Sequence, residues 1–292
     1  MTDFGREIKS GYFLVPNAAD PLLDTARELE RLGYDYLAVQ DHPYQRRYVD
    51  TWSLIGMVLG ATSRIHVFSD VANLPLRHPS VLAKSAASFD LLSGGRFDLG
   101  LGAGAFWDAI EAYGGPRRTP GEALAAEEEA IAVIRELWSG ERDLRFDGRF
   151  HSLAGAVSGP VPKRPIGIWL GSVGPRALAL TGRAADGWII SLSREIAPIA
   201  DKVARLDEAA REAGRDPGEI RRILNVNGTI TGGTAGGLLD GPPRQWVDEL
   251  TDLAVTYGFD TFVFWSAAPG GERTFVEEII PAVREQVAEE RA

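Results

Sequence analysis

An aspartate and a histidine stand side by side at the end of an apolar run, in the segment Ala38-Val39-Gln40-Asp41-His42-Pro43. Asp41 can accept hydrogen bonds, and His42 can exchange a proton near neutral pH, as a general acid–base site requires. The alternative is that Asp41 caps a loop while His42 fills a polar turn. If the run Tyr36 to Val39 is a barrel strand, both residues lie at its carboxyl end, where barrel enzymes carry their chemistry. This position favours a functional role for the pair.

Polar side chains also arrive at the end of the next apolar run, Ile65 to Val71. Ser69, Asp70 and Asn73 need hydrogen-bond partners there. A bound ligand and ordinary turn hydrogen bonds explain these residues about equally well. The histidine of the following segment, His78, is expected to pack against or cap the helix that begins there.

Glycines crowd the segment Gly94 to Gly104. Their final spacing is G-x-G-x-G, which does not fit the G-x-G-x-x-G fingerprint of dinucleotide-binding folds. Gly102 and Gly104 would let a flat ligand approach the backbone closely. Tight packing inside a barrel explains the same residues equally well.

A candidate anion site is the segment Gly171-Ser172-Val173-Gly174-Pro175-Arg176, which opens a helix. Backbone N–H groups at a helix start, a hydroxyl and a guanidinium together can hold a phosphate. The alternative is a glycine turn in which Ser172 caps the helix. The chain has 31 basic and 41 acidic residues and a net charge of −10, so any phosphate must be held locally, and we favour the anion site. The segment is not a Walker loop, and no G-x-S-x-G elbow of a serine hydrolase occurs in the chain.

Eight runs of strand length alternate with helical patterns and would position these residues. The predicted strands are Gly11 to Val15, Tyr36 to Val39, Ile65 to Val71, Phe97 to Leu101, Ile166 to Leu170, Gly187 to Ser191, Ile223 to Ile230 and Thr261 to Phe264. The apolar stripes of three helices comprise Val203, Leu206 and Ala210, then Val247, Leu250 and Ala254, and finally Phe275, Ile279 and Val283. Eight such units in 292 residues predict an α/β fold of one domain, a (β/α)8 TIM barrel over residues 1–292.

Three connections are longer than simple turns and are predicted as loop insertions. Residues 105–119 and 232–243 follow predicted strands and would lie at the C-terminal mouth of the barrel. Residues 142–165 contain a predicted hairpin around Asp147-Gly148. Helix boundaries are expected at Asp20-Pro21, which would begin a helix, and at Gly33 and Gly214, which would end two others.

Composition excludes several classes of function. The absence of cysteine excludes disulfides and thiolate sites, and the four histidines lack the close spacing of metal ligands, so no metal is expected. The acidic balance and scattered basic residues argue against nucleic acid or anionic membranes as partners. The longest apolar stretch is too short to span a bilayer and the N-terminus lacks the apolar core of a signal peptide, so a cytoplasmic protein is expected.

Several segments together resemble the bacterial luciferase-like family of flavin- or deazaflavin-dependent oxidoreductases. The matching segments, in the family's order, are Leu74-Pro75-Leu76-Arg77-His78-Pro79, Asp90-Leu91-Leu92-Ser93-Gly94-Gly95-Arg96-Phe97, Gly171-Ser172-Val173-Gly174-Pro175-Arg176 and Ala185-Asp186-Gly187-Trp188. Each segment alone is weak evidence, whereas their joint occurrence along nearly the whole chain is specific.

The resemblance implies a TIM barrel that binds a tricyclic cofactor at its mouth, with the cofactor's phosphate on residues 171–176. It also implies a non-proline cis peptide bond between Asp70 and Val71 that supports the ring. Asp41 would meet the polar edge of the ring, and His42 would lie near its reacting face. An Asp-His pair at this point is similar to members that use the deazaflavin coenzyme F420. Dimers are common in the family, so a homodimer is expected.

These features predict an oxidoreductase that transfers a hydride between coenzyme F420 and a small organic substrate. Sugar-oxidising relatives have a glutamate just after the fourth strand, where this chain has Ala105-Phe106-Trp107, so an apolar or planar substrate is expected. One alternative is an FMN-dependent monooxygenase of the same fold, which inserts oxygen with reduced flavin. A second alternative is a flavin-binding protein without catalytic activity, and a barrel lyase that uses Asp41 and His42 without a coloured cofactor is a weaker third.

Overall fold

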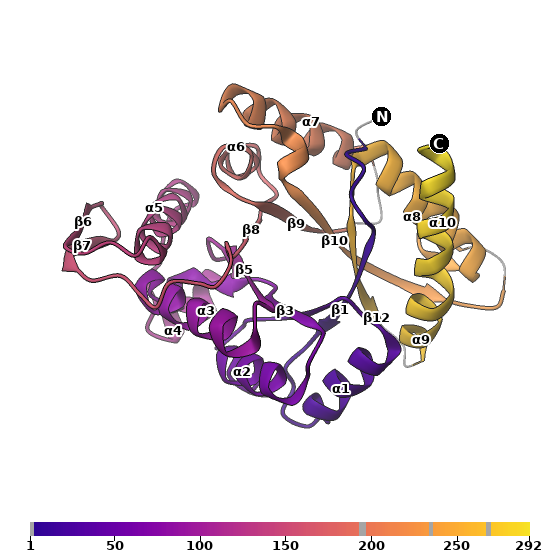
Figure 1. Ribbon diagram of the computed structural model, residues 1–292, viewed down its shortest axis with the longest axis horizontal. Coiled ribbons are helices and arrows are strands. Elements are labelled where there is room, and N and C mark those ends of the chain that lie inside the picture. The colour runs from indigo at the N-terminus through magenta and orange to yellow at the C-terminus, as the bar shows by residue number, and fades with distance from the viewer. Residues whose placement is uncertain (1–2, 193–196, 234–235, 267–269) are drawn as a thin grey trace. The chain divides into compact units, whose positions relative to one another are not determined.

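The computed structural model of the protein describes residues 3–192, 197–233, 236–266 and 270–292 (Figure 1). The chain divides into two compact units. The first comprises Met1–Leu14, Asp24–Ala38 and Ser172–Ala292, and the second comprises Val15–Leu23 and Val39–Gly171. All eight predicted strands are present among the described residues, most with boundaries within two residues of the predicted ones.

The first unit is built on a sheet in which β9, β10, β12, β1 and β2 are neighbours in that order. These strands are β1 (Lys9–Leu14), β2 (Tyr36–Val39), β9 (Gly187–Ser191), β10 (Arg221–Ile230) and β12 (Thr261–Ser266). β10 pairs in parallel with both β9 and β12, and a short strand, β11 (Asp240–Gly241), extends the far end of β10. In β1, a Cβ on Gly11 would lie 2.9 Å from Cγ2 of Val263, so glycine lets these two strands pack closely.

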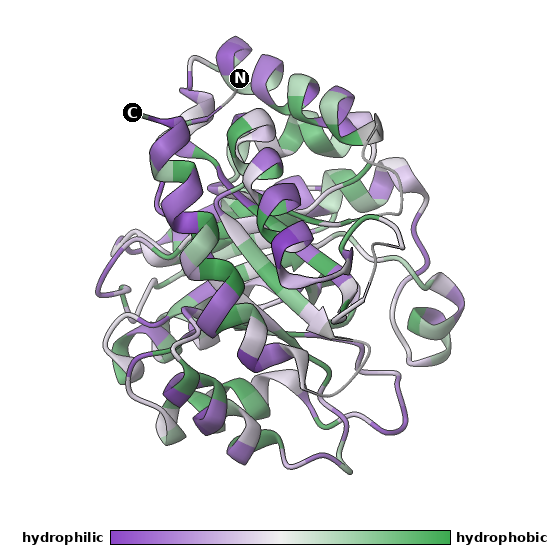
Figure 2. Cartoon of the chain, turned by 90° about the vertical axis from the view of Figure 1, so that its right-hand side faces the viewer, coloured by the Kyte–Doolittle hydropathy of each residue, from purple (hydrophilic) through white to green (hydrophobic). Residues whose placement is uncertain are grey.

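Helices follow the strands of the first unit as predicted. They are α1 (Leu22–Leu32), α6 (Pro175–Ala184), α7 (Ala197–Glu212), α8 (Pro243–Tyr257), α9 (Gly271–Thr274) and α10 (Ile280–Glu290), with a 3-10 turn at Pro217–Glu219 and a π-helical turn at Phe275–Ile279. Gly33 and Gly214 have positive φ angles of 96° and 73° after α1 and α7, which confirms both predicted helix ends. Figure 2 shows helices with both hydrophilic and hydrophobic residues and strands that are mostly hydrophobic.

The predicted apolar stripes are largely confirmed. Val203, Leu206 and Ala210 are buried, as are Phe275, Ile279 and Val283. In α8, Leu250 and Ala254 are buried, whereas Val247 is only partly buried. The preceding residue, Trp246, is fully buried instead, because its larger apolar side chain packs against Phe264 and Phe275.

The second unit is built on the parallel strands β3 (His66–Ser69), β5 (Phe97–Gly102) and β8 (Ile168–Gly171), in that order. The predicted strand Ile65 to Val71 ends earlier than expected, at Ser69, and β4 (Ala72–Asn73) resumes the pairing with β5. The peptide bond between Asp70 and Val71, which separates the two strands, is cis, as the family resemblance implied.

Helices α2 (Thr51–Ala61), α3 (Pro79–Ser93) and α5 (Pro120–Trp138) accompany these strands, with a 3-10 turn at Leu74–Leu76. His78 caps α3, since its side chain accepts a hydrogen bond from the backbone N–H of Ser80, as predicted. Thr119 and Glu122 form a reciprocal capping box at the start of α5.

The predicted insertions contain more structure than loops. Residues 105–119 include a helix, α4 (Trp107–Ala112), so their interpretation as a simple loop was wrong. The predicted hairpin is confirmed, because β6 (Leu144–Asp147) pairs antiparallel with β7 (Ser152–Ala156) around Asp147 and Gly148. Residues 232–243 include β11, while residues 234–235 lie outside the described residues.

Two features of the described residues bear on function. Within the described ranges, no helix has the length and apolar character that a membrane crossing requires. The same ranges contain no group of three or more histidine, aspartate and glutamate side chains placed to hold a metal ion.

Candidate active site

The carboxylate of Asp41 is held at the carboxyl end of β2 by a guanidinium from a distant part of the second unit. Arg77 donates from Nε to Oδ2 over 2.7 Å and from Nη2 to Oδ1 over 2.8 Å. The backbone N–H of Asn73, in β4, donates to Oδ2 over 2.9 Å. The Asp41 side chain is only 1% exposed, so these charge-assisted bonds satisfy a buried carboxylate. The network fixes the end of β2 to the segment that follows the cis peptide bond.

Arg77 is itself fixed on three sides. Its Nη2 also donates to Asp50 over 2.8 Å, and its guanidinium lies 5.5 Å from the ring centroid of Trp52. Burial lowers the pKa of Arg77. The hydrogen bonds and charge of Asp41, and then those of Asp50, raise this pKa by more than burial lowers it, so the net shift is upward. Arg77 therefore stays charged and keeps Asp41 in one orientation. The sequence does not predict that Arg77 holds Asp41, because it identifies Arg77 only as part of a segment that resembles the family.

His42 is held by an aromatic neighbour two residues along the chain. Its Nδ1 lies 2.7 Å from the hydroxyl of Tyr44. Phe106, 61% exposed, places its ring at 85° to the imidazole with centroids 5.4 Å apart. Burial lowers the pKa of His42, and the charge of Asp41 only partly offsets this effect. The imidazole is therefore neutral at physiological pH and available for proton exchange.

Two buried side-chain oxygens near this pair lack hydrogen-bond partners among the described residues. They are Oε1 of Gln40, next to Asp41, and Oδ1 of Asn73, whose own N–H binds Asp41. Buried acceptors without partners are costly, and such atoms often mark a place where a ligand donates. The sequence predicts that Asn73 needs a hydrogen-bond partner, but it does not identify the oxygen of either side chain as the acceptor.

Ser69 has a structural partner. Its hydroxyl donates to the backbone oxygen of Gly100 in β5 over 2.7 Å, and the side chain is fully buried. Asp70 is also mostly buried, with 8% of its surface exposed. The hydroxyl of Ser69 is thus satisfied by the neighbouring strand and not by a turn or a ligand, whereas the unpartnered Asn73 Oδ1 retains the ligand interpretation.

The glycines that end β5 and β8 make room for Val71. A Cβ on Gly102 would lie 2.6 Å from Cγ2 of Val71, and a Cβ on Gly171 would lie 3.1 Å from the same atom. Gly104 has a φ of 104°, and a Cβ there would lie 2.6 Å from Cγ of Pro75. Packing therefore leaves no room for a Cβ at Gly102 or Gly104, whereas at Gly171 a Cβ would require only a small shift of Val71.

The start of α6, in the first unit, offers backbone donors without a side-chain cap. Gly174 is the N-cap residue and Pro175 the first helical residue, and Arg176 is exposed. The hydroxyl of Ser172 is 2.7 Å from that of Thr181, whose own proton goes to the backbone oxygen of Ala177. Ser172 therefore donates inward to Thr181, and its hydroxyl proton is not directed toward the start of the helix.

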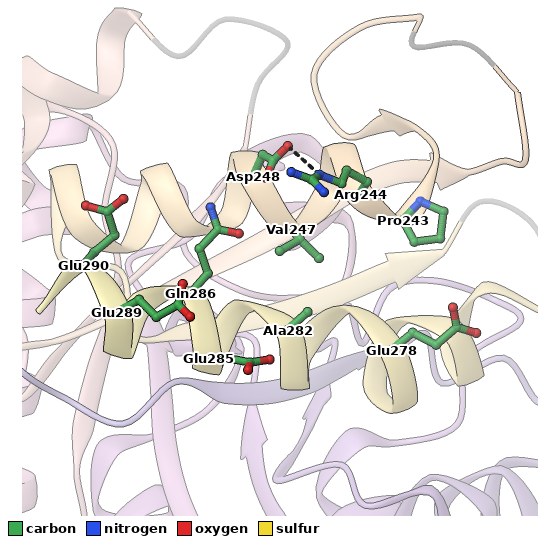
Figure 3. A pocket seen from close by; sticks show the side chains of 10 residues that line it. All are labelled: Pro243, Arg244, Val247, Asp248, Glu278, Ala282, Glu285, Gln286, Glu289 and Glu290. Carbon is green, nitrogen blue, oxygen red and sulfur yellow. Dashed lines mark ion pairs between the residues drawn. The ribbon is translucent and has the colours of Figure 1, made fainter. Parts of the chain in front are cut away.

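A separate groove lies between α8 and α10 of the first unit, and Figure 3 shows the side chains that line it. Its volume is about 630 Å³. The lining carries five carboxylates, Asp248, Glu278, Glu285, Glu289 and Glu290, and one cation, Arg244, which pairs with Asp248 over 3.6 Å. Such a surface repels phosphate, and the groove contains no predicted site residue.

A family model described as luciferase-like monooxygenase matches residues 5–231 of the chain. The chain belongs to the luciferase-like family.

Curated relatives of this luciferase-like protein are named for coenzyme F420. An F420-dependent glucose-6-phosphate dehydrogenase of Kineococcus radiotolerans is 30% identical over 233 residues, which are 76% of this chain and 68% of that protein. An F420-dependent hydroxymycolic acid dehydrogenase of Mycobacterium tuberculosis is 33% identical over 208 residues, covering 68% of this chain and 56% of that protein.

Solved structures share the fold of the luciferase-like chain at low identity. An F420-dependent secondary alcohol dehydrogenase, solved with an F420-acetone adduct, has a TM-score of 0.84 at 19% identity and covers 95% of this chain and 99% of its own. A long-chain alkane monooxygenase has a TM-score of 0.82 at 14% identity and covers 96% and 92%. Together with the eight strands and their helices, these likenesses confirm the predicted (β/α)8 TIM barrel.

Proposed function

We propose that this protein is an oxidoreductase that uses coenzyme F420 to transfer a hydride to or from a small organic substrate. The observation that carries the proposal is the neutral, half-buried imidazole of His42 beside the fixed Asp41–Arg77 pair, in a chain whose relatives are named as F420-dependent dehydrogenases. The cofactor, when bound, supplies or accepts the hydride. The residues of the chain have to orient the ring and manage one proton.

The second unit carries groups that fit the ring of the cofactor. The pyrimidine edge of flavins and deazaflavins presents an N–H donor between two carbonyl acceptors, and the unpartnered oxygens of Gln40 and Asn73 are acceptors that fit such a donor. We assign the ring to these oxygens and to the backbone at Asp70 and Val71. Asp41 contributes by holding Arg77 and Asn73 in place.

The first unit carries groups that fit a phosphate, which coenzyme F420 and FMN both contain. We assign the phosphate to the backbone N–H groups of Val173 and Gly174 and to the backbone N–H and guanidinium of Arg176. The hydroxyl of Ser172 is not included because it is engaged with Thr181. This assignment concerns the start of α6 alone.

His42 is assigned the proton transfer that accompanies hydride transfer. When a carbonyl is reduced, its oxygen needs a proton, and an imidazole can deliver it near neutral pH. The exposed ring of Phe106 beside His42 favours an apolar or planar substrate over a sugar phosphate. A relative from Mycobacterium bovis named as a phthiodiolone/phenolphthiodiolone dimycocerosates ketoreductase, 34% identical over 187 residues, is consistent with this substrate class.

The cofactor is tested by titrating the purified protein with coenzyme F420, FMN and riboflavin and following fluorescence. We expect coenzyme F420 to bind most tightly and the reduced form to be consumed when an apolar ketone is added. Tighter binding of FMN, with oxygen uptake on reduction, would favour the monooxygenase alternative instead. Tight binding without turnover of any compound in a panel of ketones, alcohols and glucose-6-phosphate would favour a binding protein.

A further inference from the structure

The turn after β2 brings Tyr44 onto His42. The backbone N–H of Gln45 donates to the oxygen of His42 over 2.9 Å, which closes a four-residue turn with Pro43 at its second position. Proline fixes φ near −65° and suits this position of a β-turn. The closed turn places the Tyr44 hydroxyl 2.7 Å from Nδ1 of the imidazole, with ring centroids 5.4 Å apart.

The chemistry of the two groups sets the direction of this hydrogen bond. Burial, and then the charge of Asp41, raises the pKa of Tyr44 to about 12, so the phenol keeps its proton. Burial lowers the pKa of His42, so the imidazole is neutral. A phenol oxygen can donate or accept, but its O–H is a stronger donor than an imidazole N–H, and an imidazole nitrogen is the stronger acceptor, so the favoured arrangement has Tyr44 donate to Nδ1. The single proton of the neutral imidazole then resides on Nε2.

The pair of His42 and Tyr44 is partly shielded from solvent. Phe106 presents its ring to both members, with centroids 5.4 Å from His42 and 6.3 Å from Tyr44. The carboxylate of Asp41, which precedes His42 in the chain, forms an ion pair with Arg77. A hydrogen bond between two partly buried rings is stronger than the same bond in water, so it can hold one tautomer.

We propose that Tyr44 is the residue that positions His42 as a proton donor, by fixing the imidazole in the Nε2–H tautomer and returning a proton to Nδ1 during the reaction. The inference rests on the proposed function and makes it more specific. With reduced coenzyme F420 as the hydride source, the substrate's carbonyl carbon gains the hydride and its oxygen takes the proton from Nε2. Tyr44 passes its own proton to Nδ1 and is reprotonated from water. The proton that the cofactor loses on oxidation returns to solvent and balances this uptake, and exchange with water restores the Nε2–H tautomer. The same tautomer lacks a free lone pair on Nε2 to accept a proton from an alcohol, so the arrangement favours carbonyl reduction.

The tautomer is measured on the whole protein without any cofactor. The chain has only four histidines, so ¹⁵N-labelled imidazole resonances can be assigned with single His→Asn variants. We expect the His42 resonances of the wild type to report a proton on Nε2, and Tyr44→Phe to increase the population with a proton on Nδ1. Tyr48→Phe removes a hydroxyl four residues later and is expected to leave the tautomer unchanged. A wild-type His42 protonated on Nδ1, or a tautomer that Tyr44→Phe does not alter, would overturn the proposal.

Kinetics with reduced coenzyme F420 and a cyclic ketone as the probe provide the second measurement. Tyr44→Phe should lower kcat by about 10- to 100-fold while KM and the cofactor Kd stay within about threefold of wild type. An equal loss in Tyr48→Phe, or an unchanged kcat in Tyr44→Phe, would contradict the role of the hydroxyl. If the wild type reduces no ketone, the proposed function fails, whereas the tautomer measurement still decides whether Tyr44 positions His42.

Discussion

Arg77 and Asp41, 36 residues apart in the sequence, form a two-pronged ion pair in which both carboxylate oxygens are bound, over 2.7 and 2.8 Å. The pair lies between the end of β2 and the turn after β4, and the Arg77 side chain is 16% exposed. Because the carboxylate is buried, its energetic importance comes mainly from the cost of leaving it unsatisfied. The ion pair therefore makes the geometry around His42 depend on Arg77, a residue to which we assign no step of the reaction.

Arg77→Lys should destabilise the protein by about 1–3 kcal/mol, because lysine keeps the charge but cannot make both hydrogen bonds. The free energy of unfolding in urea measures this effect. Arg27→Lys changes an exposed ion pair with Asp24 and should alter stability by at most about 0.5 kcal/mol. Equal stability of both variants would show that the two-pronged bond contributes little.

Gly102→Ala should destabilise the protein by about 1–3 kcal/mol, because the new Cβ would lie 2.6 Å from Cγ2 of Val71. Adding Val71→Ala should restore part of the loss, and urea unfolding of the single and double variants forms the cycle that measures it. Gly60→Ala, in α2 with no atom within 4 Å of the new Cβ, should not destabilise. If Gly102→Ala is as stable as wild type but binds cofactor poorly, the glycine serves the ligand and not packing.

Glu127→Gln should remove a pH dependence of stability. Glu127, on α5, is 2% exposed, and burial raises its pKa from 4.5 to about 8. The folded state therefore holds this proton more tightly than the unfolded state, and stability present below pH 4.5 is lost as the pH rises toward 8. As the pH rises from 5 to 8.5, the free energy of unfolding of the variant should increase by roughly 2–5 kcal/mol relative to that of the wild type, as measured by urea unfolding. The exposed Glu136→Gln on the same helix is the control, and an equal gain there would refute this assignment.

His42→Asn should lower turnover by about 10²- to 10⁴-fold while cofactor affinity stays within about threefold of wild type. The reason is that we assign the proton transfer to His42 and the ring contacts to Gln40 and Asn73. Steady-state kinetics and cofactor titration measure the two effects. His78→Asn replaces the N-cap of α3 with another good cap and should preserve turnover. Full activity of His42→Asn would remove the histidine from the reaction.

Arg176→Gln should weaken binding of FMN by about 3- to 10-fold and leave binding of riboflavin, which lacks the phosphate, unchanged. Arg176 is exposed in the first turn of α6, beside backbone N–H groups that no side chain caps. Fluorescence titration of both ligands provides the comparison, and Arg183→Gln in the last turn of the same helix is the matched control. A similar loss for riboflavin would place the phosphate elsewhere.

Local patterns were sufficient for most of the fold. The strands Tyr36–Val39 and Gly187–Ser191 have the predicted boundaries, and Gly33 and Gly214 end helices as predicted. These features follow from side-chain periodicity and backbone preferences, which act over a few residues. The prediction that Asp41 and His42 follow a strand depended only on such a local boundary, and it is confirmed.

Tertiary structure alone decided what these residues do. The partner of Asp41 is 36 residues away, and the atom that a Cβ at Gly102 or Gly171 would meet first belongs to Val71. Even the bond between His42 and Tyr44, two residues apart, depends on a turn closed by Gln45, and burial shifts the pKa of both side chains. A sequence specifies which groups are present and how each segment folds locally. Which groups meet, and which are withdrawn from water, depends on packing between distant segments, and this packing sets their protonation and chemistry.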